Sequence, residues 1–174
     1  MIFLGDIWIT FRDFMETGGD VLFLILIATL VLWTLIIERY WYLSKIFPSV
    51  VTKAISDWND RSDKTSWAAH RIREKLVSEV SNKLSAPMPF IKTLVGICPL
   101  FGLLGTVTGM IAVFEVMAIT GTSNARLMAS GISMATIPTM AGMVASLSGL
   151  FFSTRLEQRA KMEEEKLAEN LQFN

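Results

Sequence analysis

The sequence predicts an all-α membrane protein with three transmembrane helices and long cytoplasmic helical extensions. The chain has 174 residues and is 52% hydrophobic, which is typical of a membrane protein rather than a soluble domain. Residues 20–43, 91–119 and 127–154 are mostly apolar, and a transmembrane helix needs about 20 such residues. Charged residues gather between the first two of these segments and after the third, so we expect those stretches to lie in water.

Residues 1–19 predict a short amphipathic helix on the outer surface of the membrane. One face of this helix carries Ile7, Trp8, Phe11, Phe14 and Met15. Trp and Phe opposite a charged face are typical of the membrane interface. Asp6 precedes the first basic residue, Arg12, which is unlike a secretory signal. Gly18 and Gly19 end the helix, and Asp20 is suited to cap the next one.

The first span covers residues 20–43. Val21 to Ile37 is apolar except for two threonines, and the aromatic residues 40–42 form a belt at the end of the span. Glu38 and Arg39 lie just before this belt. We expect them to pair with each other or to reach the headgroups, and so to anchor the span.

Residues 44–90 predict a helical arm outside the membrane rather than a separate domain. The arm has two apolar helical faces, one before and one after a turn at residues 59–64. The faces consist of Val50, Val51, Ala54, Ile55 and Trp58, and of Ala69, Ile72, Leu76, Val80 and Leu84. Pro87 and Pro89 end the arm before the second span.

The second and third spans, 91–119 and 127–154, predict an antiparallel hairpin around a turn at 120–126, with its tip near Thr122 and Ser123. Small residues recur in both spans at helical spacing and let helix backbones approach closely. The candidate packing residues are Gly102, Gly105, Gly109, Gly131, Ala135, Gly142, Ser146 and Gly149. Two interpretations are open: packing inside one subunit, or a seam shared by several subunits with hydroxyls along a water-filled path.

Thr106 and Thr139 lie at similar depth in this hairpin. Each is roughly 16 residues from the tip, or about 25 Å of helix. One interpretation is that each hydroxyl bonds to a carbonyl of its own helix. The other is a polar ring that faces a proton-carrying group on another chain. Glu115 is the one acid in the two spans, so it is a further candidate for the proton path, although it lies near the tip and close to interfacial water.

The tail, residues 155–174, continues as a helix with Leu156, Ala160, Leu167 and Leu171 on one face, and we expect it to pack against the arm. Most Lys and Arg residues lie in the arm or the tail, and only Arg12 and Arg126 lie on the other side of the spans. Because cytoplasmic flanks carry the excess of basic residues, the N-terminus and the hairpin tip are predicted to face outward.

Several function classes are not indicated by the sequence. It contains no nucleophile–base pair, phosphate-binding loop or metal-ligand cluster, so we expect neither an enzyme nor a bound cofactor. The net charge is zero and no basic tract is interleaved with aromatics, which argues against nucleic acid as a partner. The single cysteine, Cys98, excludes an intrachain disulfide and a multi-cysteine metal site.

The run from Pro99 to Ile111, PLFGLLGTVTGMI, followed by Phe114, resembles the second-span motif of the ExbB/TolQ/MotA family of proton-channel motor proteins. The third span resembles the family through Gly131-Ile132-Ser133, Ala135, Thr139, Gly142, Met143 and Val144. Three spans with a large loop after the first are closer to ExbB and TolQ than to MotA, which has four. A flagellar stator is therefore disfavoured.

The resemblance implies a subunit of the bacterial inner membrane that forms a ring, a pentamer, around the helices of an ExbD- or TolR-like partner. An aspartate of that partner carries the proton. Proton flow drives a TonB-like protein, which opens outer-membrane transporters for iron-siderophores, haem or vitamin B12. By motif position, Thr106 and Thr139 correspond to the pore-facing threonines of the family.

Two positions depart from the family pattern. Met134 stands where ExbB proteins often carry a glutamate, and Leu147-Ser148 replaces an Ile-Pro pair. Glu115 is then the only acid available in these two spans. Two alternatives to an ExbB-like role are a TolQ-like subunit of the Tol-Pal envelope-maintenance system and a passive membrane scaffold.

Overall fold

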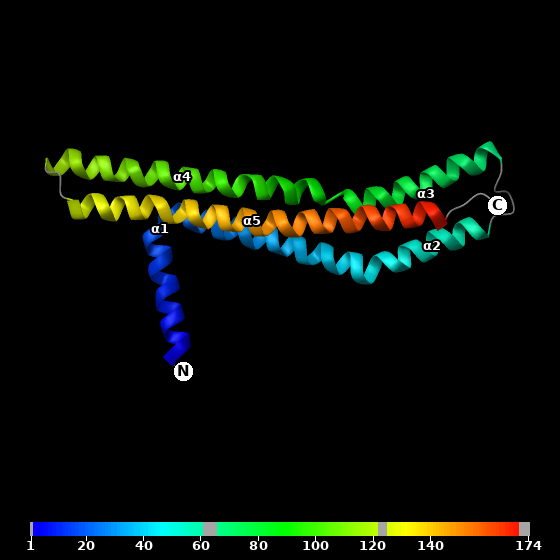
Figure 1. Cartoon of the computed structure of the whole chain (residues 1–174), viewed down its shortest axis with the longest axis horizontal. Helices are drawn as coiled ribbons and strands as arrows, with labels where there is room; N and C mark the ends of the chain where they lie inside the picture. Colours follow the sequence, from blue (N-terminus) through cyan, green and yellow to red (C-terminus); the bar gives the residue numbers. More distant parts are fainter. Residues whose placement is uncertain (1, 61–65, 122–124, 171–174) are drawn as a thin grey trace. The chain divides into compact units, whose positions relative to one another are not determined.

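A computed structural model describes residues 2–60, 66–121 and 125–170 (Figure 1). All regular structure in these ranges is helical, as the sequence predicts. The elements are α1 (Ile2–Trp41), the π-helical segment η1 (Tyr42–Ile46), α2 (Phe47–Asn59), α3 (Trp67–Ser85), α4 (Met88–Thr120) and α5 (Ala125–Asn170). The predicted turns at 59–64 and 120–126, including the tip at Thr122 and Ser123, fall partly or wholly outside the described residues, as does Leu171 of the tail.

Three helical stretches are long and apolar enough to cross a membrane, the number that the sequence predicts. They fall within Trp8–Asn59, Trp67–Ile119 and Met128–Asn170. Many large apolar side chains of α4 and α5 are exposed in the isolated chain, among them Leu103, Val107, Ile111, Val144 and Leu147. Lipid chains are a suitable environment for such a surface, and the chain is a membrane protein.

Helix α1 is broken at Gly19, which has φ 65° and ψ −166°. A Cβ at this position would meet no atom within 4 Å, so the requirement for glycine comes from the backbone conformation alone. The segment before Gly19, dark blue in Figure 1, points away from the axis of the rest of α1. Its Trp8, Phe11 and Phe14 side chains are exposed.

The chain divides into two compact units. The first, here called the hairpin unit, consists of the residues up to Leu32 together with Thr93–Gly149. The second, the arm unit, consists of Trp33–Lys92 together with the residues from Leu150 onward. Helices α1, α4 and α5 each contribute to both units.

One buried cluster of the hairpin unit is built from small side chains, although Leu22, Ile25 and Leu32 of α1 are also buried in this unit. Ala28 of α1, Cys98 of α4 and Ala145 of α5 are buried together, with Phe101 packed against them. Pro138 is also fully buried inside α5. Small residues on three helices allow the backbones to approach closely, as in other helix contacts in membranes.

The core of the arm unit is built from larger side chains. Trp58 of α2, Leu84 of α3 and Leu167 of α5 are each 1% exposed. Ser66 caps α3 by accepting a hydrogen bond from the Ala69 amide at 3.2 Å. Arg73 of α3 donates to the Ala168 carbonyl of α5 at 2.8 Å, so the end of α5 is held against the arm.

Between α1 and α2 the chain forms a π-helical turn, η1, whose one buried side chain is Leu43. A π-helical turn holds one residue more than the surrounding α-helix. Phe47, Ala54 and Trp58 of α2 are buried after this turn. The turn therefore accommodates an extra residue, and side chains both before and after it are buried.

Arg39 corrects an expectation from the sequence. Its side chain is only 5% exposed, so it is buried within the arm unit rather than extended outward. Instead its guanidinium donates to the carbonyls of Lys83, at 2.5 Å, and of Leu84, and it lies over the Tyr42 ring at 4.6 Å. The residue four positions after Lys83 is Pro87, which has no N–H to offer that carbonyl. Arg39 supplies the donor that the proline lacks.

Candidate functional site

The candidate site lies in the contact between α4 and α5 of the hairpin unit, where the two backbones approach closely. A Cβ placed at Gly109 would lie 2.8 Å from the Ala135 Cα, and one at Gly102 would lie 2.9 Å from the Thr139 Cα. A Cβ at Gly142 would lie 2.5 Å from the carbonyl oxygen of Cys98. Real Cβ atoms do not come this close to backbone atoms, so these positions accept no larger residue without moving a helix.

The other candidate packing residues belong to the same set of contacts. Gly105 faces Pro138, and Gly131 faces Val113. A Cβ at Gly149 would lie 2.6 Å from Cδ2 of Leu32, so this glycine lies against α1.

Ser146 adds a hydrogen bond from its hydroxyl to the Val95 carbonyl at 2.9 Å, and Ala135 is 4% exposed. In the isolated subunit these small residues therefore contact helices of the same chain.

Thr139 lies at the edge of this contact and bonds across it. Its hydroxyl donates to the carbonyl of Gly102 on α4 at 2.9 Å, with a longer approach of 3.4 Å to the Ala135 carbonyl of its own helix. The side chain stays partly exposed. The hydroxyl oxygen still has lone pairs that can accept a hydrogen bond from water or from a protonated group.

Thr106 lies one helical turn after Gly102, and so about 6 Å along the axis from the level of Thr139. Its hydroxyl donates to the Leu103 carbonyl of its own helix at 2.6 Å, and its side chain is also partly exposed. The two threonines therefore lie within about one turn of each other along the α4–α5 contact. Their hydroxyls bond differently, because Thr139 joins the two helices and Thr106 does not.

Glu115 is exposed and is not brought to the threonines. It follows Thr106 by nine residues, which places it about 180° around α4 from Thr106. Met134, at the position where the family resemblance leads us to expect glutamate, is 37% exposed. Within one chain the structure therefore groups Thr106 with Thr139 and leaves Glu115 on the other side of α4.

The chemistry available at the contact is hydrogen bonding rather than proton release. Between Thr93 and Gly149 the ionisable side chains are Cys98, Glu115 and Arg126. Cys98 is buried, and Glu115 lies on the far side of the helix from Thr106. Neither α4 nor α5 therefore places a carboxyl group beside Thr106 and Thr139 in the described part of these helices. In the described part of the chain, no three or more His, Cys, Asp or Glu side chains gather as a metal site would require.

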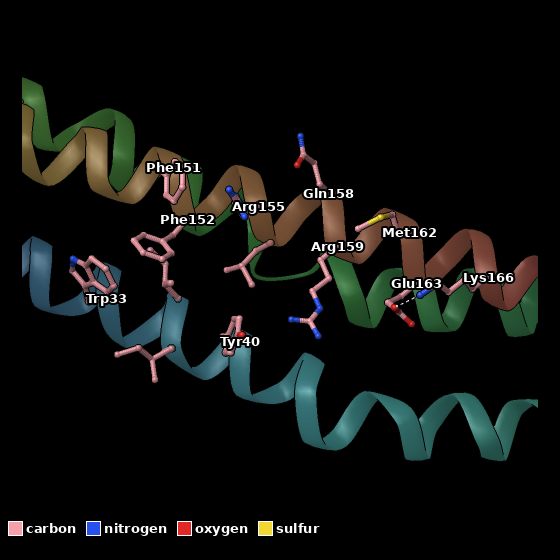
Figure 2. A pocket seen from close by; sticks show the side chains of 13 residues that line it. Trp33, Tyr40, Phe151, Phe152, Arg155, Gln158, Arg159, Met162, Glu163 and Lys166 are labelled. Atoms are coloured by element: carbon pink, nitrogen blue, oxygen red, sulfur yellow. Dashed lines mark hydrogen bonds and ion pairs between the residues drawn. The ribbon is translucent and has the colours of Figure 1, made fainter.

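A second feature was missed from the sequence. The arm unit contains a groove between α1 and α5, with a volume of about 1010 Å³ (Figure 2). Its lining includes Trp33 and Tyr40 of α1 and Phe152, Arg155 and Arg159 of α5. The signal in the sequence is the spacing of Arg155 and Arg159, four residues apart and directly after two phenylalanines, but only the folded chain shows which residues of α1 oppose them.

Comparison with known proteins agrees with the family resemblance of the second and third spans. The family model for the MotA/TolQ/ExbB proton channel family matches residues 43–169. The chain is 28% identical over 165 residues to the putative biopolymer transport protein ExbB-like 1 of Synechocystis sp., covering 76% of this chain and 65% of that protein. It is 31% identical over 86 residues to the Tol-Pal system protein TolQ of Pseudomonas aeruginosa, covering 49% and 37%. The chain thus spans less than two thirds of the length of either relative.

Proposed function

Because the chain belongs to the MotA/TolQ/ExbB proton channel family, we propose that it is the proton-channel subunit of an inner-membrane energy-transducing motor of the ExbB–ExbD–TonB type. In this role it uses the proton motive force to drive outer-membrane import of iron-siderophores, haem or vitamin B12. Its partners are an ExbD-like subunit, whose aspartate binds the proton, and a TonB-like protein.

The observation that carries this proposal is the position of the Thr139 hydroxyl. It is fixed by donating to the Gly102 carbonyl across the α4–α5 contact, and its side chain remains partly exposed. Thr106 lies about one turn away. Two hydroxyls without a neighbouring acid suit a wall that accepts hydrogen bonds from water and from a protonated carboxyl group on a partner helix.

The assembly and orientation follow the family resemblance and the charge distribution. Five copies surround the partner helices, with Thr106 and Thr139 toward the centre. The arm and tail, which hold most of the basic residues, lie in the cytoplasm, and the N-terminus lies in the periplasm. Glu115 lies close to the outer end of α4, where it would exchange protons with water at the mouth of the path.

The test is the change Thr139→Val in the complex with its co-expressed partner, reconstituted in proteoliposomes. Valine removes the hydroxyl and keeps the shape, so we expect proton flux to fall about tenfold or more while the mass of the complex is unchanged. Thr108→Val is the matched control, because Thr108 is exposed and bonds only to the Leu104 and Gly105 carbonyls of its own helix. Equal flux in Thr139→Val and wild type would refute the pore role.

A TolQ-like role in envelope maintenance is the second candidate, and the match to TolQ of Pseudomonas aeruginosa favours it. Both roles use the same proton path, so the Thr139 variant does not separate them. Neighbouring genes do: a gene for a TonB-like protein supports transport, and one for a TolA-like protein supports envelope maintenance.

A passive scaffold is the remaining alternative. It predicts that losing a hydroxyl has no effect, whereas enlarging a packing glycine does. In a scaffold, Thr139→Val leaves cell growth and complex mass unchanged. Gly142→Leu still destroys the complex, because the leucine would collide with the Cys98 carbonyl.

A further inference from the structure

The groove of the arm unit is not needed for a proton path, and its two ends differ in chemistry. Figure 2 shows Trp33 and Phe152 at one end and Arg159, with Tyr40 opposite it, farther along. Trp33 and Tyr40 are seven residues apart on α1, and Phe152 and Arg159 are seven apart on α5. Each pair is therefore separated by about 10 Å along its helix.

The first end is apolar and aromatic. The Trp33 and Phe152 ring centroids are 5.0 Å apart in an edge-to-face arrangement, and Phe151 and Phe152 are 5.4 Å apart. Ile37 on α1 is 62% exposed beside them. These residues lie in the last parts of the first and third predicted spans. We therefore expect this end of the groove to lie in the outermost hydrocarbon of the bilayer.

The groove also has two cations held over aromatic rings, Arg155 beside the first end and Arg159 at the second. The Arg155 guanidinium lies 5.1 Å from the Phe151 ring centroid, and the Arg159 guanidinium lies 5.6 Å from the Tyr40 centroid. In the described part of the chain neither arginine forms an ion pair, and both are exposed. Lys166, which also lines the groove, differs because its ammonium is paired with Glu163 at 2.8 Å.

Stacking on a ring fixes the plane of a guanidinium and leaves its N–H groups at the edge free to donate. Arg155 and Arg159 are four residues apart, and guanidiniums are suitable donors for the oxygens of a phosphate. The carboxylate of the groove, Glu163, is paired with Lys166 rather than with either arginine. The headgroup layer on each side of a bilayer is about 5 to 8 Å thick. A separation of about 10 Å between the two ends of the groove is therefore enough to pass from hydrocarbon into the headgroup layer.

We propose that this groove binds one phospholipid with an anionic headgroup. Arg155 and Arg159 hold the phosphate, and an acyl chain lies against Trp33, Ile37 and Phe152. A free phosphate would use the cationic end only and would leave the aromatic end exposed to water. The proposed lipid site lies outside the α4–α5 contact. Evidence against the proton-channel role would therefore not count against lipid binding, and the reverse also holds.

The test is native mass spectrometry of the full chain in detergent, titrated with phosphatidylglycerol or with phosphatidylcholine. We expect phosphatidylglycerol to bind more tightly to the wild type. The double change Arg155→Gln and Arg159→Gln should weaken that binding about tenfold or more, because charge-assisted hydrogen bonds to phosphate are lost. Thermal unfolding of the double variant checks that it folds.

Two further variants control for charge and for stacking. Arg71 also lies over an aromatic ring, Trp67 at 5.5 Å, but it is paired with Glu74 at 3.2 Å and lines no part of the groove, so Arg71→Gln should leave lipid binding unchanged. Arg155→Lys with Arg159→Lys keeps both charges and should keep most of the preference for phosphatidylglycerol.

Three outcomes would overturn the proposal. Equal binding of the two lipids to wild type would remove the role of headgroup charge. Full displacement of phosphatidylglycerol by inorganic phosphate would show a phosphate site rather than a lipid site. An unchanged lipid count together with an altered oligomer mass in the glutamine double variant would show that the groove is an interface between copies of this chain.

Discussion

The hairpin unit and the arm unit hold their helices together in different ways. In the hairpin unit the contacts between α4 and α5 are made by glycines, and by hydroxyls such as Ser146, which donates to the Val95 carbonyl. In the arm unit they are made by large apolar side chains, and by guanidiniums such as Arg73, which donates to the Ala168 carbonyl. Both units join helices through backbone carbonyls, but the donors and the packing atoms differ.

The two kinds of contact gain stability from different sources. Lipid chains are as apolar as leucine, so burying a large side chain in the membrane brings little stability, and close backbone contact takes its place. Where a helix is surrounded by water, burying a large apolar side chain stabilises a fold by about 1.5–3 kcal/mol. The same chain therefore uses small residues in one set of helix contacts and large residues, such as Leu84 and Leu167, in the other.

The largest expected effect is in the hairpin unit. Gly142→Leu places a side chain against the Cys98 carbonyl, where even a Cβ would be 2.5 Å away. We expect a loss of about 3 kcal/mol or more of stability, because backbone atoms cannot yield as side chains do. The resistance of the membrane-embedded fragment to protease measures this loss of stability.

Gly96→Leu is the matched control for this change. A Cβ at Gly96 meets no atom within 4 Å, so this variant should keep the stability of the wild type. If both leucine variants are equally resistant to protease, close backbone contact is not what holds the hairpin unit together.

A medium effect is expected in the arm unit from Arg39→Met. Methionine keeps the apolar stem but removes the donors to the carbonyls of Lys83 and Leu84. Hydrogen bonds to charged groups contribute about 1.5–3 kcal/mol, so we expect a loss in that range. Faster hydrogen exchange of the backbone amides at the end of α3 would show where this stability is lost.

Arg71→Met is the control, because it alters only an exposed ion pair and should change stability by less than about 1 kcal/mol. A similar loss in both variants would contradict the role given to Arg39.

The smallest effect is expected from the ion pair between Lys92 and Glu157, 2.9 Å apart in the arm unit. The hydrogen bond from Lys92 lowers the pKa of the Glu157 carboxyl. A carboxyl with a lowered pKa stabilises the fold above its unfolded pKa of about 4.3, and the contribution is lost as pH falls through the lower folded pKa.

Because the pair is partly exposed, we expect its contribution to be below about 1 kcal/mol. The free energy of unfolding of wild type and Glu157→Gln should therefore differ slightly at neutral pH and converge below about pH 4. A difference that grows on acidification would contradict this assignment.

The fold class and the family were predictable because they depend on local patterns. Three apolar runs indicate three spans without reference to any contact, and the structure has three helices of suitable length and composition. The motif from Pro99 to Ile111 identified a family that the comparisons then confirmed over residues 43–169.

Contacts between distant residues were not predictable in this way. Arg39 was expected to anchor the span at the headgroups, yet it bonds to carbonyls 44 and 45 residues away, and no periodicity relates it to them. Arg155 and Arg159 served in the sequence only as evidence of orientation. Their significance depends on which residues of α1 oppose them across the groove.

The π-helical turn η1 has a consequence for chain length. Successive residues of an α-helix are rotated by about 100°, so an inserted residue in a regular helix turns every later side chain away from its former neighbours. A π-helical turn absorbs such an insertion locally, and the phase of the helix is kept. A chain one residue shorter between Tyr42 and Ile46 could therefore form a regular helix there and still turn Trp58 inward, whereas a deletion inside α2 itself would rotate Trp58 out of its buried position.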